Sequence, residues 1–233
     1  MAEKVIGILG GMGPEAAVDI FHRIVKSTPA RKDQEHLRIL IDNNPKVPDR
    51  QEAILKGGPS SAPEMIKMAR GLERQGAELL IIACNTAHYY LSEVRASVQV
   101  PVLSIIEETL DAVRRQVPGI RAVGILMSAG LARVGIYQEA FRNADIEPLV
   151  PQGPDLEEVQ RIIYRVKEGS HGDGELTALR AVMASLMRRG AQAMALGCTE
   201  LPVLCKGHTF DVPVIDGNQV LAEAAVREAG KAD

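Results

Sequence analysis

Two cysteines occupy the same place in two similar stretches of the chain. Residues 76–88 read GAELLIIACNTAH, and residues 190–202 read GAQAMALGCTELP. Each stretch opens with Gly-Ala, continues as a short apolar segment and reaches Cys84 or Cys198, which small polar residues follow. A thiol has a reference pKa of about 8.5, and polar donors or a helix N-terminus lower it toward neutrality. Two thiols at equivalent positions can therefore supply an acid and a base. Two unrelated buried cysteines would not be expected to recur at the same place of a repeat.

The residues after each cysteine bear on its ionisation. Thr86 and Thr199 stand where a helix is expected to begin, so the following N–H groups would favour a thiolate. Cys205 has no counterpart in the first half of the chain, and we interpret it as structural.

Two neighbouring residues allow two interpretations each. His88 either orients or acidifies the Cys84 thiol, or it lies on the surface of a helix. Glu200 either tunes Cys198 or caps the following turn. The sequence alone leaves both alternatives open.

Two basic residues are candidates for binding a carboxylate. Arg50 lies in DNNPKVPDR, which we expect to be a loop leaving the end of a strand. Arginine is a natural bidentate partner of carboxylates. Lys167, in IIYRVKEG, is a second candidate from the other half of the chain. For both residues the alternative is a solvated charge on the surface.

A glycine-rich turn follows the first apolar run. Residues 11–16 fit the G-x-G-x-x-A fingerprint of dinucleotide-binding proteins. The acidic residue expected about 20 residues later is missing, because Asp42 comes too late. We therefore interpret Gly10–Gly13, which includes Met12, as a turn whose backbone N–H groups approach a carboxylate of the ligand.

Buried strands alternate with amphipathic helices along the whole chain. Unbroken apolar runs separated by helical stripes indicate parallel sheets covered by helices on both faces, an α/β fold. The predicted strands are 5–9, 37–42, 79–83, 122–126, 149–150 and 193–196, and the predicted helices are 15–26, 63–75, 136–143, 176–189 and 218–228.

The second half repeats the order of the first. Both begin with an apolar strand that has glycine at its third place, and both contain a Val-Pro-Val step, at 100–102 and 212–214. We predict two pseudo-symmetric α/β domains, residues 1–104 plus 216–233 and residues 105–215. Ligands of parallel sheets bind beyond the carboxyl ends of the strands, where both cysteines fall. The active site is therefore expected in the interdomain cleft.

Composition excludes several classes of partner. The net charge of −3 and the absence of Trp argue against nucleic acid. No apolar run approaches the roughly 20 residues of a membrane span. Three cysteines without a secretion signal favour the cytoplasm. The five histidines are scattered without ligand spacing, so we predict no metal, and HGDGE at 171–175 is expected to be a solvated loop.

Several motifs together resemble one known family. GILGGMGPEA, DNNPKVPDR, ACNTAH, SIIEET and LGCTELP look like the aspartate/glutamate racemase family, in particular its aspartate racemase branch. The resemblance covers nearly the whole chain. It implies two pseudo-symmetric domains, a homodimer, no cofactor, and a two-base mechanism in which Cys84 and Cys198 flank the α-carbon of a dicarboxylic amino acid.

The resemblance also implies roles for the surrounding residues. Asn85, Thr86 and Thr199 correspond to residues that bind the α-carboxylate. Arg50 and Lys167 correspond to the residues that bind the distal carboxylate.

The chain departs from the family pattern in its second-half turn, MSAGLARVG. Ser128 and Leu131 replace threonines that are common in the family, and Ala17 stands where threonine is frequent. Ser128 retains a hydroxyl for the substrate carboxylate, whereas Leu131 would reshape the side-chain pocket.

The leading hypothesis is a cofactor-independent racemase of aspartate, or of glutamate. Two alternatives remain. The first is a related isomerase or decarboxylase acting on a non-amino dicarboxylate such as maleate. The second is a catalytically silent binding protein for acidic metabolites, which would not need two thiols.

Overall fold

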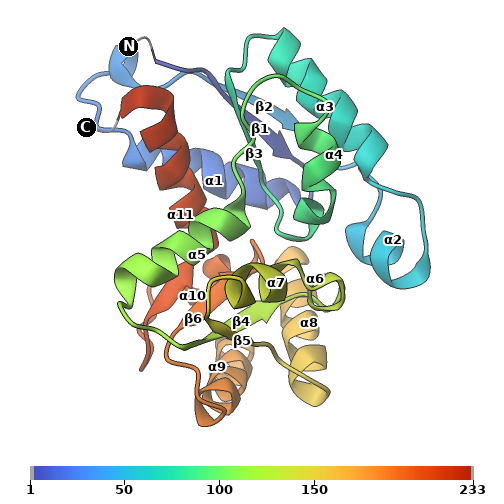
Figure 1. Cartoon of the computed structure of the whole chain (residues 1–233), viewed down its shortest axis with the longest axis vertical. Helices are drawn as coiled ribbons and strands as arrows, with labels where there is room; N and C mark the ends of the chain where they lie inside the picture. The colour runs from blue at the N-terminus through green and yellow to red at the C-terminus, as the bar shows by residue number, and fades with distance from the viewer. Residues whose placement is uncertain (1–2, 232–233) are drawn as a thin grey trace. The chain divides into compact units, whose positions relative to one another are not determined.

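The computed structural model describes residues 3–231. The chain divides into two compact units. The first runs to Glu108 and takes up the chain again from Asn218, and the second is Thr109–Gly217. Each unit has its own parallel sheet (Figure 1).

The first unit carries a sheet in the strand order β2-β1-β3. Every residue of β1 and β3 is buried, so helices cover both faces of these strands, whereas β2 is an exposed edge. The elements that lie in it wholly or in part are β1 (Ile6–Gly10), α1 (Pro14–Ser27), η1 (Asp33–Glu35), β2 (Ile39–Asn43), α2 (Arg50–Lys56), α3 (Ala62–Arg74), β3 (Leu79–Ile82), η2 (Thr86–Tyr90), α4 (Leu91–Arg95), α5 (Ile105–Gln116), α11 (Gly217–Val226) and the π-helical turn η3 (Arg227–Lys231).

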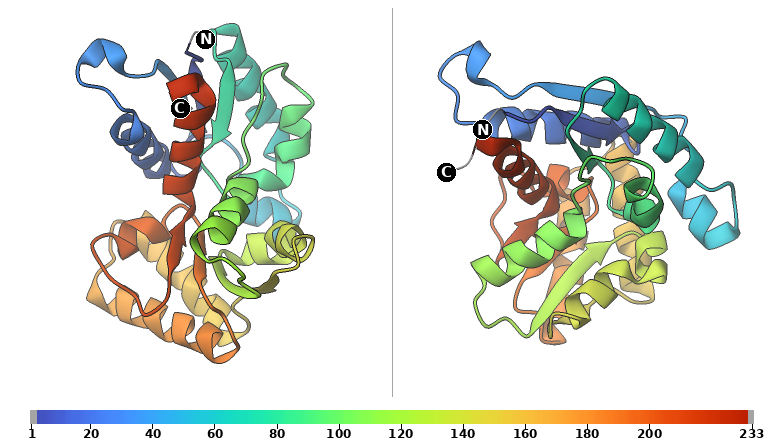
Figure 2. Two further views of the ribbon diagram at one scale, coloured as in Figure 1. Left: turned by 60° about the vertical axis from the view of Figure 1, so that its left-hand side comes forward. Right: turned by 45° about the horizontal axis from the view of Figure 1, so that its top comes forward.

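The second unit carries a sheet in the order β5-β4-β6-β7, and all its pairs are parallel. The helices α8 and α9 pack side by side against its central strands (Figure 2). Its remaining elements are β4 (Ala122–Met127), α6 (Ala129–Val134), α7 (Ile136–Arg142), β5 (Glu147–Leu149), α8 (Pro154–Lys167), α9 (Asp173–Arg188), β6 (Met194–Gly197), α10 (Leu201–Cys205) and β7 (Val214–Asp216).

The same backbone hydrogen bond occurs beside the third strand of each unit. The N–H of Leu80 donates to the carbonyl of Pro101, and the N–H of Met194 donates to that of Pro213, both at 2.9 Å. Each proline is the centre of a Val-Pro-Val step, whose last valine pairs in parallel with β3 or begins β7. The repeated sequence motif thus has a repeated structural role.

The glycine at the third place of each predicted first strand also has a repeated role. A Cβ on Gly7 would lie 2.5 Å from the side chain of Leu80 and 2.9 Å from Cβ of Ala77. A Cβ on Gly124 would collide with the side chain of Met194 in the same way. Both glycines leave room for the residue on the neighbouring strand.

The last helix belongs to the first unit and lies beside α1 (Figures 1 and 2). Nδ2 of Asn218 donates to Asp19 at 2.9 Å, and Arg23 donates to Oε1 of Gln219 at 3.2 Å. These contacts join the two ends of the chain.

Parallel sheets flanked by helices confirm the predicted fold class. Two expectations were wrong. Arg50 does not lie in a loop but begins α2, where Asp49 caps the helix by accepting from the N–H of Glu52 at 2.8 Å. The solvated loop expected at 171–175 contains the first turn of α9.

Candidate functional site

Cys84 lies just beyond the C-terminal end of β3. Its thiol is free and buried, and it belongs to the core cluster of the first unit. Asn85 and Thr86 follow it, and both are also buried. Because η2 begins at Thr86, the cysteine and its two polar neighbours lie together at the edge of the sheet where parallel sheets bind ligands.

Both ring nitrogens of His88 hydrogen-bond to the backbone and not to the Cys84 thiol, and the ring is buried, not on a helix surface. The N–H of Ile105 donates to its Nε2 at 3.1 Å, so Nδ1 carries the ring proton and donates to the main-chain oxygen of Cys84 at 2.9 Å. Burial lowers the pKa of the His88 imidazole to about 4. The ring is therefore a neutral bridge that fixes the backbone next to the thiol.

The turn after β1 approaches the chain after β2 very closely. Gly11 has a φ of 90°, and a Cβ there would overlap the backbone of Asn44. The first glycine of the apparent dinucleotide fingerprint thus has a structural reason. Met12 is buried, and its carbonyl accepts from Nη2 of Arg50 at 3.1 Å.

The guanidinium of Arg50 is buried and held by main-chain carbonyls. Nη1 donates to the carbonyls of Pro48 at 2.9 Å and Val47 at 3.3 Å, in addition to the contact with Met12. Within residues 3–231, Arg50 has no carboxylate partner and its Nε has no hydrogen bond. A buried cation without an ion pair is chemically suited to receive an anionic ligand.

Cys198 lies just beyond the end of β6 and is buried in the core cluster of the second unit. Its Sγ donates to Oε2 of Glu200 at 2.9 Å, and the hydroxyl of Thr199 donates to the same oxygen at 3.2 Å. Burial first, and then the Glu200 carboxylate, raise the pKa of the Cys198 thiol well above its ordinary value. Glu200 thus acts on Cys198, which is one of the two roles the sequence left open.

Lys167 ends α8 and reaches the same carboxylate. Its Nζ lies 3.7 Å from Oε1 of Glu200 and 6.0 Å from the centre of the Tyr164 ring. The structure therefore assembles Cys198, Thr199, Glu200 and Lys167 into one cluster within the second unit.

Ser128 lies just beyond the end of β4, where its hydroxyl caps α6. It accepts from the N–H of Leu131 at 3.4 Å, and both residues are fully buried. Tyr137 of α7, which the sequence did not single out, is buried close enough to Cys198 to interact with it electrostatically, and burial raises the pKa of its phenol. No local motif marks this tyrosine, because its proximity to Cys198 arises only in the folded unit.

The third cysteine has a different environment. Cys205 ends α10, and burial raises the pKa of its thiol to about 12. Within the described residues it makes no side-chain hydrogen bond, in contrast to Cys198.

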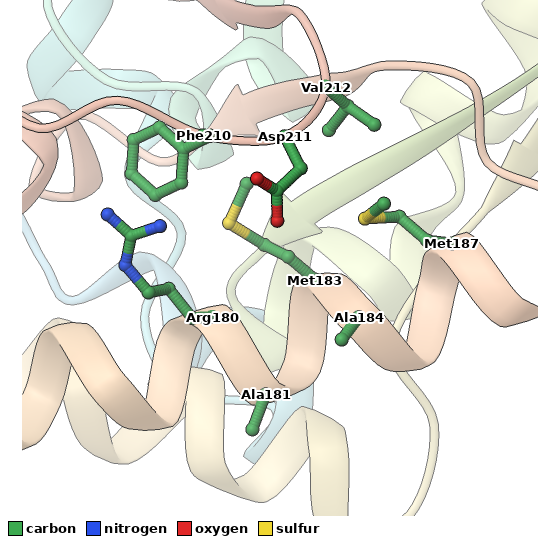
Figure 3. A pocket seen from close by; sticks show the side chains of 8 residues that line it. All are labelled: Arg180, Ala181, Met183, Ala184, Met187, Phe210, Asp211 and Val212. Atoms are coloured by element: carbon green, nitrogen blue, oxygen red, sulfur yellow. The ribbon is translucent and has the colours of Figure 1, made fainter.

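The second unit also has a pocket beside α9 (Figure 3). Its volume is about 310 Å³, and α9 and the segment before β7 form its walls. Val212 lines it and precedes β7, whereas Cys198 follows the parallel strand β6, so the pocket lies toward the opposite edge of the sheet. Arg180 stacks on Phe210 there, 4.5 Å from the ring centre. The pocket contains none of the predicted site residues.

Two other kinds of site are absent from the described part of the chain. Residues 3–231 contain no group of three or more His, Cys, Asp or Glu side chains suited to a metal ion. No helix in this range is both long and apolar enough to cross a membrane.

Two of the known proteins compared below resemble this chain over nearly its full length. The model of the family described as Asp/Glu/Hydantoin racemase matches residues 9–225. The broad specificity amino-acid racemase RacX of Bacillus subtilis (strain 168) is 27% identical over 235 residues, covering 95% of this chain and 96% of that protein. The structure of the Picrophilus torridus aspartate racemase superimposes with a TM-score of 0.83 and 31% identity, covering 97% of this chain and 94% of that one. A glutamate racemase of Corynebacterium kroppenstedtii is 28% identical over 186 residues, covering 75% of this chain and 59% of that protein.

Proposed function

Because the chain belongs to the Asp/Glu/Hydantoin racemase family, we propose that it interconverts L- and D-aspartate, with Cys84 and Cys198 as the two bases. One observation carries this proposal. Two free, buried thiols follow equivalent parallel strands, and polar side chains adjoin each of them. Racemisation needs an acid and a base that act on opposite faces of one α-carbon, and a duplicated thiol supplies both.

The proposed reaction moves one proton in each of two steps. The thiolate of one cysteine removes the α-proton and becomes a thiol, leaving a carbanion that is delocalised into the α-carboxylate. The thiol of the other cysteine then donates its proton to the opposite face and becomes a thiolate. The reverse reaction exchanges these roles.

The carbanion requires stabilisation, because the proposal includes no cofactor to delocalise its charge. Preorganised donors are the usual solution in proteins. We assign this role to Asn85 and Thr86 beside Cys84 and to Thr199 beside Cys198, with the Met12 turn and Ser128 as further contacts of the α-carboxylate. All five residues are buried.

Arg50 is the group that we expect to select a dicarboxylic substrate. A buried guanidinium that makes no ion pair within residues 3–231 should bind a substrate with a second carboxylate more strongly than a substrate with an apolar side chain. Lys167 contributes positive charge as well, although Glu200 lies 3.7 Å from it. Aspartate is favoured over glutamate because the aspartate racemase of Picrophilus torridus is similar along nearly the entire chain.

Proton NMR in deuterated water tests the proposal. Purified protein without added cofactor is incubated with L-aspartate or, separately, with L-glutamate, and the enantiomers are then separated on a chiral column. Loss of the α-proton signal together with formation of the D-enantiomer is the expected result, and it ranks the two substrates. Exchange with retained configuration would mean that only one thiol works. Silence with both amino acids would refute the proposal and turn attention to a non-amino dicarboxylate such as maleate.

We also expect a homodimer, as the resemblance to the aspartate racemases implies. Light scattering of the full chain measures this directly, and a monomer mass at working concentration would contradict it.

A further inference from the structure

We propose that Glu200 is a positioning residue that holds the proton on Cys198, so that in the resting enzyme Cys198 is the acid and Cys84 is the base. This inference rests on the proposed two-base function. It adds an inequality between the two thiols, which their repeated sequence positions would not suggest.

The hydrogen bond between Cys198 and Glu200 carries the inference. Sγ lies 2.9 Å from Oε2, and both residues are buried. In such a pair a single proton can be on either sulfur or oxygen. Sγ is the donor in this hydrogen bond and Oε2 the acceptor, so the proton resides on sulfur and the negative charge on the carboxylate. A thiolate at Cys198 would then lie directly beside a negative charge.

Two charged groups shift the pKa of Cys198, and a third titratable group, Tyr137, interacts with it from another helix of the second unit. Glu200 follows it along the chain and raises its pKa, whereas Lys167 of α8 lowers it. Tyr137 of α7 has a raised pKa because it is buried, so its phenol stays neutral. Since Lys167 lies 3.7 Å from the other carboxylate oxygen, it reduces the effect of Glu200 without removing the carboxylate from the thiol.

Within residues 3–231, Cys84 has no carboxylate partner of this kind. The position equivalent to Glu200 in the first repeat is Thr86, which carries no charge. The nearby His88 is a neutral ring bound to the Cys84 carbonyl and not to its sulfur. Among residues 3–231, no carboxylate hydrogen-bonds to the Cys84 thiol. The two thiols therefore differ in the one neighbour that would disfavour a thiolate.

The inequality has a kinetic consequence. One enantiomer reacts with the form in which Cys84 is the thiolate, and the other needs the scarcer form with the Cys198 thiolate. The apparent affinity for a substrate is proportional to the fraction of the protein in the form that binds it. The enantiomer that needs the Cys198 thiolate therefore has the higher KM. Because the two enantiomers have equal free energies, kcat/KM is the same in both directions, so kcat must differ by the same factor as KM.

Alkylation by iodoacetamide tests the inference. Only the thiolate reacts, so the rate of alkylation reports how much of each cysteine is ionised, and no catalytic activity is needed. Mass spectrometry of the full chain follows each cysteine separately across a series of pH values, with Cys84 as the reference in the same molecule. Glu200→Gln retains the shape of the side chain and removes its charge. At a fixed pH below the pKa of Cys198, the rate of Cys198 alkylation relative to Cys84 should rise about tenfold or more. A rise of about tenfold corresponds to a fall of one unit in the pKa of Cys198.

Three further variants separate charge from accessibility. Lys167→Met should slow Cys198 alkylation, because the positive charge that favours the thiolate is gone. Glu200→Asp keeps the negative charge, so the pH profile of Cys198 alkylation should stay close to that of the wild-type protein. Glu147→Gln removes an exposed carboxylate from the same unit and should change nothing. Equal acceleration in Glu200→Gln and Lys167→Met would show that loosened packing, and not charge, controls the thiol, and would overturn the inference.

The kinetic readout is separate. If the wild-type protein racemises aspartate, Glu200→Gln should narrow the KM difference between the enantiomers. Unequal KM values that the substitution leaves untouched would count against the inference. If the wild-type protein racemises no amino acid, the proposed function fails, whereas the alkylation profile still decides whether Glu200 holds the proton on Cys198.

Discussion

His88 is hydrogen-bonded through Nδ1 to the main-chain oxygen of Cys84, at 2.9 Å. Its other ring nitrogen accepts from the N–H of Ile105, at the start of α5. Both nitrogens are therefore used by the backbone, and the ring fixes the segment that carries one of the two proposed bases.

The buried neutral ring should make stability depend on pH. The unfolded chain takes up this proton near pH 6.5, and the folded chain only near pH 4. Between these values the unfolded state binds more protons, so the free energy of unfolding should fall by about 3 kcal/mol as the pH is lowered across this range. Urea unfolding at a series of pH values measures this. His88→Gln should flatten the dependence, and identical slopes in the two proteins would contradict the assignment.

Replacing either proposed base should abolish racemisation. General acid–base groups contribute about 10²- to 10⁴-fold to rate, so Cys84→Ser and Cys198→Ser should each lose at least that factor in turnover. One α-proton exchange can survive in each variant, since the remaining thiol still serves one face. Cys205→Ala is the matched control, because this cysteine is buried but makes no side-chain hydrogen bond within the described residues. Chiral chromatography is the measurement, and near-normal turnover in either serine variant would disprove the two-base assignment.

Arg50→Lys should weaken the binding of dicarboxylic substrates selectively. Lysine keeps the charge but loses the planar fork, and hydrogen bonds to charged groups are worth about 1.5–3 kcal/mol. The KM for aspartate should therefore rise about tenfold to a hundredfold, while any activity on alanine changes little. Arg74→Lys, on the exposed end of α3, controls for the substitution itself. An equal effect on both substrates would remove Arg50 from the binding site.

Gly7→Ala should destabilise the first unit. Its Cβ would lie against Leu80 and Ala77, and overpacking of this kind costs about 1–3 kcal/mol. Gly71→Ala is a control of opposite sign, because Gly71 lies within α3 with open space around a Cβ, and alanine favours helix by up to about 1 kcal/mol. Thermal unfolding of the two variants compares them, and a stabilised Gly7→Ala would contradict the packing described for β1.

The sequence predicted the architecture well where hydrophobic pattern and glycine punctuation agree. The strand expected at 79–83 is β3 at Leu79–Ile82, and the helix expected at 63–75 is α3 at Ala62–Arg74. The prediction of an amino-acid racemase, an isomerase, is likewise confirmed at the level of the family. The substrate and the two-cysteine mechanism remain proposals.

Short helices were harder to predict. The prediction of a loop at Arg50 overlooked a local signal. Asp49 and Glu52 mark the start of α2, and Gly57 marks its end. A run as short as α2 shows too little periodicity to outweigh the prolines before it.

Contacts that depend on side-chain conformation left no signal at all. The sequence could not distinguish a Glu200 that binds the Cys198 thiol from one that caps a turn, because both need the same residue at the same place. The pairing of Lys167 with Glu200 depends on where α8 ends relative to β6, which only the packed unit determines.

The N–H groups of Leu80 and Met194 make matching hydrogen bonds to Pro101 and Pro213. Residues of the first repeat can therefore be assigned to equivalent residues of the second. The two residues that follow each cysteine correspond in the repeat, so Thr86 occupies the place of Glu200. The acidic neighbour can therefore be transplanted between halves, by Thr86→Glu combined with Glu200→Thr. In such a molecule the carboxylate would follow Cys84 instead of Cys198, and the enantiomer that needs the Cys84 thiolate should have the higher KM.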